Sequence, residues 1–199
     1  MMDNVRHFLG VVCVVILPPG MLFWFLIHPW ARWWRRLGPA RTYLIVVPLV
    51  VSVGALVYRV RGPLLGEDLG TNWILIGIAA IFYGMTTWFE FQYWRYLSIA
   101  TLVGVTELSP TGNESGKLLR EGIYARVRHP RYASAGLAVI GHVLLINYLG
   151  LYIFILLAIP MGLWLLALEE RELVDRFGDA YRQYQREVPQ LVPRLRRTP

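Results

Sequence analysis

The sequence predicts an all-α integral membrane protein with five transmembrane helices and a cytoplasmic C-terminal region. Of its 199 residues, 56% are hydrophobic and 17% are charged, whereas a soluble domain carries about 25% charged residues. A helix that crosses a bilayer needs about 17 to 25 apolar residues. Four uncharged stretches reach that length: residues 8–27, 42–58, 69–89 and 132–168. This apolar content excludes a disordered chain, and the single cysteine excludes a disulfide scaffold.

The first stretch, residues 8–27, is expected to remain as a span rather than to be removed as a signal peptide. It follows Arg6, but it is longer than a usual signal-peptide core and no small-residue cleavage pattern comes after it. Pro18 and Pro19 predict a break inside this helix. Cys13 lies in the same helix, where a free cysteine usually packs as a small hydrophobe.

The charges between the spans predict their orientation. Residues 31–41 hold four arginines and no acid, which places this connection in the cytoplasm by the positive-inside rule. Residues 59–68 balance two arginines against Glu67 and Asp68, as suits the outer side. We therefore expect a protein of the inner or plasma membrane, with the N-terminus outside and the C-terminus in the cytoplasm. The arginines flank apolar runs, so the net charge of +7 indicates topology and not nucleic-acid binding.

The fourth stretch, residues 132–168, is close to twice the length of a span and predicts two helices with a turn at residues 147–150. The whole chain, residues 1–199, is then a single membrane-embedded domain. Three spans fall in residues 1–89. The polar segments of residues 90–199 gather at the cytoplasmic ends of the last helical hairpin and form the expected functional region.

Two helices are expected at the membrane surface. Residues 96–105 suggest an interfacial helix or a continuation of the third span. The tail, residues 169–187, has an apolar stripe at helical spacing, and Pro189 ends it. The stripe consists of Glu170, Leu173, Phe177, Tyr181 and Tyr184. An amphipathic helix on the membrane is one interpretation; because the stripe begins with a carboxylate, a role at a polar site is the other.

The entry to the fourth span has features of an anion site. Pro130 fits the first helical position and favours an extended His129. Arg126, Arg128 and Arg131 surround the free backbone N–H groups of this helix N-terminus, a setting that attracts anions. Two other interpretations remain open: the arginines anchor the span at the membrane surface, and His129 caps the helix.

The fourth span itself carries a small-residue face. Ser134, Ala138 and Gly141 recur at helical spacing and predict close approach of another helix, or of a flat ligand. His142 is interpreted as a polar packing group. No metal site is expected there, because no second histidine, cysteine or carboxylate stands at ligand spacing on this span.

The hairpin brings the arginine-rich entry and the Glu169–Glu170 pair to one end, where they suit a zwitterion with a carboxylate and an amino group. The run GIYARVRHPRY, the glutamate pair and the tail pattern through Pro189 resemble the isoprenylcysteine carboxyl methyltransferase family and its phospholipid methyltransferase relatives. The resemblance covers residues 117–193. Residue 134, often glycine in these relatives, is Ser134 here, with Gly136 two positions later.

The resemblance implies an integral membrane methyltransferase that binds S-adenosyl-L-methionine from the cytoplasm and receives a lipophilic acceptor from the bilayer. We expect catalytic roles for Glu170, His129 and Arg128. In this hypothesis Arg128 and the helix N-terminus bind the methionine carboxylate, and Glu169 or Glu170 faces the cationic side. The resemblance implies that Tyr124, His129, Tyr132, Glu169 and Glu170 contact or shape the cofactor site, and Tyr181 matches the family's tail. The full set of expected cofactor-binding residues is Leu118, Tyr124, Arg128, His129, Tyr132, Gly136, Glu169, Glu170 and Tyr181. No glycine-rich strand-turn-helix signature of a soluble nucleotide-binding domain is present.

The acceptor is less constrained by the sequence than the cofactor. Carboxyl O-methylation of an isoprenylcysteine-like thioether is the first expectation, and it needs no general base. Phospholipid N-methylation and thiol S-methylation are the alternatives, and they need a proton acceptor such as His129 or a glutamate. A lipid-binding membrane protein without catalytic activity is the alternative from another class. Five spans without inverted repeats argue against a transporter.

Overall fold

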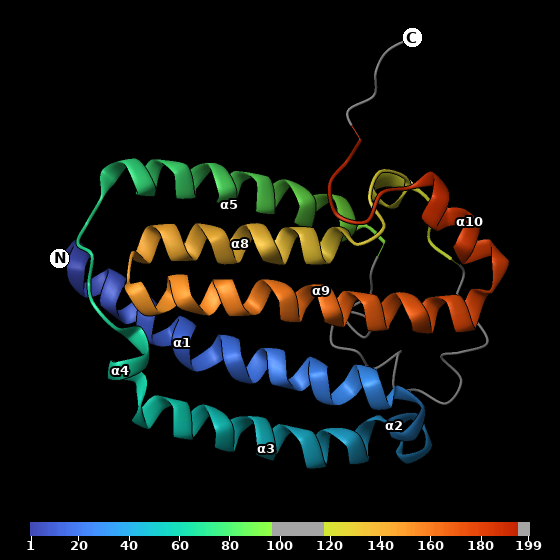
Figure 1. The fold of residues 1–199 in the computed structure, drawn as a ribbon, viewed down its shortest axis with the longest axis horizontal. Helices are drawn as coiled ribbons and strands as arrows, with labels where there is room; N and C mark the ends of the chain where they lie inside the picture. Colours follow the sequence, from blue (N-terminus) through green and yellow to red (C-terminus); the bar gives the residue numbers. More distant parts are fainter. Residues whose placement is uncertain (97–117, 195–199) are drawn as a thin grey trace, which may run out of the picture.

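The computed structural model describes residues 1–96 and 118–194 and shows a bundle of long helices (Figure 1). Five long helices lie side by side, and short helices connect or follow them. The long helices are α1 (Met2–Ile27), α3 (Pro39–Arg59), α5 (Trp73–Tyr93), α8 (Pro130–Ile146) and α9 (Leu149–Phe177). The short ones are η1 (His28–Trp30), α2 (Ala31–Leu37), α4 (Arg61–Leu65), η2 (Gly122–Ala125) and α10 (Asp179–Glu187). No strand occurs in the described residues, which confirms the all-helical prediction.

Four of the described helical segments are long and apolar enough to cross a membrane: α1 with η1, α3, α5 and α9. Helix α8 is apolar but has only 17 residues. Four of the five predicted spans therefore have the required length, and the fifth is shorter than expected. The surface helix predicted for residues 96–105 lies, apart from Tyr96, outside the described residues.

Helix α8 packs against α5, the long helix before it in the chain, and against α9, the long helix after it. Its small-residue face lies against α5, because a Cβ atom on Gly141 would be 3.2 Å from the Tyr83 ring. The Ser134 and Thr86 hydroxyls lie 3.5 and 3.4 Å from each other's backbone carbonyl. Asn147 ends the helix in the left-handed conformation at φ 56°, which turns the chain into α9. The small-residue face thus serves helix packing, as its spacing favours.

The α1 helix differs from the sequence-based expectation in one respect. It continues through Pro18 and Pro19 to Ile27, so these prolines lie inside the helix instead of dividing it. Cys13 is buried against Val143 and Leu151 in an apolar cluster, as expected of a small hydrophobe.

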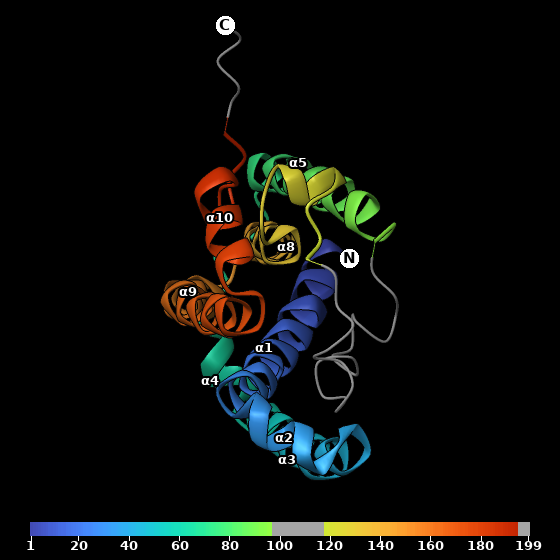
Figure 2. The ribbon, with the colours of Figure 1, turned by 90° about the vertical axis from the view of Figure 1, so that its right-hand side faces the viewer.

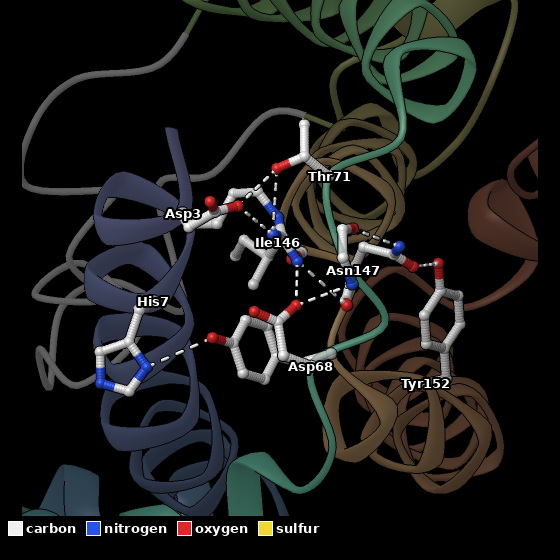
Figure 3. A network of polar contacts seen from close by, with 10 residues as sticks. Asp3, His7, Asp68, Thr71, Ile146, Asn147 and Tyr152 are labelled. Atoms are coloured by element: carbon white, nitrogen blue, oxygen red, sulfur yellow. Dashed lines mark hydrogen bonds and ion pairs between the residues drawn. The ribbon is translucent and has the colours of Figure 1, made fainter. Parts of the chain in front are cut away.

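A polar cluster around Arg6 closes the end of the bundle that lies away from α10 (Figures 1 and 3). The Arg6 side chain is 1% exposed. Its Nε donates to the Ile146 carbonyl at 3.0 Å, and its Nη1 donates to Asp3 at 3.0 Å and Thr71 at 3.1 Å. Its Nη2 forms an ion pair with Asp68. One guanidinium thereby joins α1, the α4–α5 connection and the α8–α9 turn.

The C-terminal tail is not the single helix that its periodicity predicts. Helix α9 continues past Glu170 to Phe177, and Gly178 then breaks the path at φ 57° and ψ −132°. Such a backbone conformation favours glycine because it has no Cβ atom. Helix α10 follows at a new angle, beyond the end of α9 (Figures 1 and 2). The apolar stripe continues across the break, so periodicity alone did not reveal it.

Candidate active site

The two sequence motifs meet because the chain before α8 pairs with the chain after α10. The Arg128 backbone N–H donates to the Pro189 carbonyl at 2.9 Å, and the His129 N–H donates to the Gln190 carbonyl at 3.0 Å. Proline at position 189 still supplies its carbonyl group as an acceptor. This short backbone pairing fixes the arginine–histidine segment over the end of α9, where the glutamate pair lies.

The carboxylate of Glu170 is the centre of the polar groups that this pairing brings together. Its Oε1 accepts from Arg128 Nε at 2.8 Å and lies 2.7 Å from Arg128 Nη2. His129 Nε2 is 3.0 Å from the same oxygen, and Tyr181 donates to it at 3.5 Å. The Glu170 Oε2 accepts from Gln185 Nε2 at 3.1 Å. We call Arg128, His129, Glu170, Tyr181 and Gln185 the Glu170 cluster.

The Glu170 cluster is a shielded ion pair with additional donors. The side chains of Arg128 and Glu170 are 10% and 14% exposed. A buried carboxylate is costly unless a cation and hydrogen bonds compensate it, and this cluster supplies both. Arg128 Nη1 also donates to the carbonyls of Gln185, at 2.9 Å, and Val188. The guanidinium therefore contacts the carboxylate directly, whereas the sequence suggested that the two groups face each other across a ligand.

His129 and Glu169 continue the polar region beyond the ion pair. His129 is 5% exposed. Its Nε2 faces Glu170 and also lies 3.4 Å from the Tyr181 hydroxyl. Its Nδ1 lies 3.9 Å from Glu169, whose side chain is 25% exposed. One imidazole thus stands between both glutamates of the pair, and Glu169 is the more accessible carboxylate.

The α10 helix supplies a buried tyrosine pair. Tyr181 and Tyr184 are 1% and 2% exposed, and they pack with Val188 against α9. The Tyr184 hydroxyl donates to the Tyr124 carbonyl in η2. Burial raises the pKa of Tyr184 to about 12, and burial together with the charge of Glu170 raises the pKa of Tyr181 well above its ordinary value. Both phenols are therefore neutral hydrogen-bond donors over the physiological pH range.

The other residues that the family resemblance implied lie at varying distances from the cluster. The Tyr132 ring stands edge-on to His129, with the ring centroids 5.8 Å apart. Leu118 packs on the Tyr181–Tyr184 pair, and Tyr124 packs on Ile123 and Val127. Gly136 is different, because it is exposed on α8 and a Cβ atom there would meet nothing within 4 Å.

Position 134 has a structural role in this chain. Ser134 is 2% exposed, and it faces Thr86 of α5 rather than the Glu170 cluster. The serine in place of a glycine therefore affects the packing of α5 on α8. It does not narrow the space beside Glu170.

Two glutamines line the candidate site, and they were not predicted from the sequence. A hollow of about 290 Å³ opens beside Glu170. Its lining residues are Ala167, Glu170, Arg171, Val174, Asp175, Gln185 and Gln190. Gln185 stands four residues after Tyr181, so helical spacing was a signal that it shares a face with the apolar stripe. Gln190 follows α10 in irregular chain, and no local pattern marks it.

The fold and the site define a helical protein with several helices of membrane-crossing length and a buried polar site at one end of the bundle. The model of the phospholipid methyltransferase family matches residues 73–180. The chain therefore belongs to the phospholipid methyltransferase family. The matched region contains Arg128, His129, Glu169 and Glu170 of the site and ends just before Tyr181.

Three curated proteins are similar to this chain. A protein-S-isoprenylcysteine O-methyltransferase of Schizosaccharomyces pombe is 37% identical over 41% of the chain and 35% of its own length. Methanethiol S-methyltransferase 1 of Bradyrhizobium diazoefficiens is 40% identical over 36% of the chain and 24% of its own length. A methanethiol S-methyltransferase of Pseudomonas deceptionensis is 29% identical over 84% of the chain and 66% of its own length.

The chain thus matches about a third and a quarter of the first two relatives and about two thirds of the third. No solved structure matches it.

Proposed function

We propose that this protein is a membrane methyltransferase that transfers the methyl group of S-adenosyl-L-methionine to a lipophilic acceptor. The observation that carries the proposal is the Glu170 cluster. Two motifs separated by the whole α8–α9 hairpin converge on one carboxylate, with Arg128 at 2.8 Å and His129 at 3.0 Å. The family membership and the names of the three relatives support the same reaction class.

The donor set at this end of the bundle fits the proposed cofactor. A methionine-derived sulfonium carries a carboxylate and two positive centres. Glu169 and Glu170 are the carboxylates that would face the positive centres, and the first turn of α8 offers backbone N–H groups to the negative one. The hollow beside Glu170 adds the polar groups of Gln185 and Gln190. Its volume of about 290 Å³ is close to the lower end of the range for ligand pockets.

The chain's own residues would act mainly by positioning and electrostatics. The cofactor supplies an activated methyl group on a sulfonium when it is bound. Arg128 holds Glu170 in one orientation through its contacts with the carboxylate and two backbone carbonyls. Glu169, next in the chain and more accessible, would hold the cationic side of the ligand. Correct orientation of two reactants lowers a barrier by about 7 to 11 kcal/mol in favourable cases.

Carboxyl O-methylation of an isoprenylcysteine-like thioether is our first choice of acceptor chemistry. A carboxylate acceptor has no proton to lose, so it needs no general base. Thiol S-methylation is the second candidate, and a specific finding favours it: the Pseudomonas thiol methyltransferase matches 84% of the chain. A thiol acceptor must lose its proton, and His129, which lies between two glutamates, is the residue to accept it. Phospholipid N-methylation is the third candidate.

The proposed topology places the site at the cytoplasmic surface. In it α8 completes a five-span bundle as a short fifth span, packed between α5 and α9 (Figure 2). Helix α2 lies at the same end of the bundle as α10 (Figure 1), which carries Tyr181 and Gln185 of the Glu170 cluster. Helix α2 itself carries Arg35 and Arg36. Arginines at this end fit the cytoplasmic side. The proposed membrane is the inner or plasma membrane.

One experiment tests the function and sorts the acceptors. The purified protein is incubated with methyl-labelled S-adenosyl-L-methionine and, in parallel, with an S-farnesyl cysteine, a long-chain thiol or phosphatidylethanolamine. Transfer of label to one of them is the expected result, and its chemical class identifies the acceptor. Failure to bind the cofactor in a calorimetric titration would instead favour a lipid-binding protein without catalytic activity.

A further inference from the structure

The N-terminal part of the chain also reaches the site, although it lies outside the region that the family model matches. We call η1 and α2, residues 28–37, the N-terminal corner. The corner packs on α9, because η1 contacts that helix and Arg35 of α2 forms an ion pair with Glu172. The Arg35 side chain is 15% exposed and the Glu172 side chain is 31% exposed. This ion pair is therefore partly shielded from solvent.

The position of Glu172 on α9 brings the corner beside Glu169. Residues three apart in a helix share a face, so Glu169 and Glu172 lie on one side of α9. Glu170 is turned by about 100° to the neighbouring side, where the Glu170 cluster holds it. Helix α9 therefore presents Glu170 to the Glu170 cluster, and Glu169 and Glu172 to the side that the N-terminal corner covers.

His28 is the titratable side chain of η1, the part of the corner that contacts α9. It lies near enough to Glu169 and Arg131 for their charges to act on its ring. The ring stacks on Trp24 with a centroid separation of 5.3 Å and an interplanar angle of 23°, which fixes its orientation. His28 is only partly buried, so a ligand can reach it.

An apolar contact joins α1 and α9 about one helical turn before His28. Phe25 of α1 and Trp164 of α9 have ring centroids 5.3 Å apart. Trp164 is 58% exposed. A molecule with a polar head and an apolar body fits this arrangement, with the head at His28 and the body along Phe25 and Trp164.

We propose that His28 binds the reacting head group of the acceptor and that the Arg35–Glu172 ion pair positions the N-terminal corner for this contact. The inference rests on the proposed methyltransferase function and adds a residue that decides acceptor binding. Glu169, 3.9 Å from His129 Nδ1, then stands between the cofactor side and the acceptor side. This arrangement brings the cofactor side and the acceptor side together at Glu169, as the transfer of a methyl group between them requires.

The first test separates acceptor binding from cofactor binding. In a His28→Phe variant, we expect the KM for an S-farnesyl cysteine or a long-chain thiol to rise about tenfold, as for the loss of a hydrogen bond to a charged group. Binding of the same probe in detergent without cofactor should weaken equally. The Kd for S-adenosyl-L-methionine should stay within about twofold. A His28→Gln variant, which keeps a hydrogen-bonding group, should recover part of the loss.

His142 provides a matched control. It is a partly buried histidine that contacts the Ala138 carbonyl of its own helix at 2.7 Å and stands edge-on to Tyr83. A His142→Phe variant should leave the acceptor KM and the cofactor Kd unchanged. An unaltered acceptor KM in His28→Phe, or an equal loss of cofactor affinity, would overturn the inference. Absence of transfer by the unmodified protein to every acceptor would instead contradict the proposed function.

The second test addresses the positioning ion pair. Arg35→Glu and Glu172→Arg each place like charges together, and we expect either change to raise the acceptor KM while the cofactor Kd stays constant. The double variant with exchanged charges should restore most of the acceptor affinity. Because the exchange restores the pair and not the original residues, recovery shows that the contact matters. Single variants with an unaltered acceptor KM, or a double variant without recovery, would contradict the positioning role.

Discussion

Glu170 has several donors around a single carboxylate, and this concentration explains why the residue types of the cluster are specific. Arg128 gives the matching charge, and a planar guanidinium can meet a carboxylate with two nitrogen atoms. His129 and Tyr181 complete the contacts of the same oxygen. A lysine in place of Arg128 would keep the charge but lose the contacts with the Gln185 and Val188 carbonyls. We therefore regard the cluster as one unit whose members are not interchangeable.

The buried phenol of Tyr184 gives a prediction for alkaline pH. Its pKa is raised from 10.0 to about 12, so the neutral form is favoured in the folded state. The corresponding stability is fully present below pH 10 and is lost as pH rises from 10 through 12. A Tyr184→Phe variant should lose stability less steeply over this range, although it also loses the hydrogen bond to Tyr124.

Unfolding midpoints in detergent at pH 8, 10 and 11.5 check this prediction. The hydrogen bond contributes about 1 kcal/mol at each of these three pH values. Ionisation of the phenol instead changes how steeply the stability falls as pH rises. Equal slopes in the variant and the unmodified protein would contradict the account of the buried tyrosine pair.

The sequence predicted the residues of the cluster only in part. Arg128, His129 and Glu170 could be predicted, because two recognisable motifs flank a predicted hairpin. Gln185 was missed although its helical spacing from Tyr181 was a signal. Gln190, which lines the hollow beside the cluster, could not be predicted, because its position depends on the backbone pairing of His129 with its carbonyl, a long-range contact that has no local pattern. For the same reason the direct ion pair between Arg128 and Glu170 could not be predicted from their separation in the chain.

At the scale of helices, the turn between α9 and α10 decides where the tail groups lie. Gly178 has φ 57° and ψ −132°, and it places Tyr181 and Gln185 against Glu170. A Gly178→Ala variant should lose about 1 to 3 kcal/mol of stability, the cost of a side chain in a disfavoured conformation. Methyl transfer should fall with it, since the α10 donors move.

A glycine inside α9 provides the control for this prediction. A Cβ atom on Gly162 would meet nothing within 4 Å. In a helical position, alanine is favoured over glycine by up to about 1 kcal/mol. A Gly162→Ala variant should therefore keep its activity and its unfolding midpoint, or gain slightly. If Gly178→Ala behaves like Gly162→Ala, the turn does not position the site.

Sequence periodicity succeeded for helices that pack along their length and was wrong where a helix changes direction. The hairpin turn predicted at residues 147–150 falls at Asn147, and the small-residue face of α8 lies against α5 as expected. The tail was predicted as one helix, because the stripe through Phe177 and Tyr181 continues in register across the break at Gly178. A glycine inside a periodic segment was the available signal, but glycine also occurs within helices.

At the scale of the molecule, the bundle has the candidate site at one end and the Arg6 cluster at the other (Figures 1 and 3). Breaking a buried ion pair by removal of one partner costs about 3 to 5 kcal/mol. Because only Arg6 is buried and the side chains of Asp3 and Asp68 are 72% and 38% exposed, we expect the lower end of this range, about 3 kcal/mol, for Arg6→Met. This corresponds to a fall of about 6 to 12 °C in the unfolding midpoint.

Arg182 is the control for this substitution. Its side chain is 54% exposed and pairs with Asp179, which is 96% exposed. An exposed pair contributes about 0 to 1 kcal/mol, so Arg182→Met should hardly change the midpoint. Equal midpoints for the two variants, measured in the same detergent, would show that the Arg6 cluster does not hold the bundle together.

The orientation of the whole bundle gives a prediction that the single native cysteine makes practical. In a Cys13→Ser background, Glu67→Cys should react from outside intact cells with a membrane-impermeant maleimide. Asp179→Cys should react only after permeabilisation, since the proposed site faces the cytoplasm. Labelling in the reverse order would contradict the topology inferred from the arginine distribution.

The most direct test of the central claim is a comparison of cofactor binding and methyl transfer in Glu170→Gln with those in Glu187→Gln. Both glutamates accept from an arginine, but the side chains of Arg120 and Glu187 are 36% and 50% exposed. The account predicts that Glu170→Gln reduces labelled-methyl transfer at least about 100-fold and weakens S-adenosyl-L-methionine binding, while Glu187→Gln keeps both near the values of the unmodified protein. A folded Glu170→Gln protein that binds the cofactor and transfers methyl groups normally would contradict it.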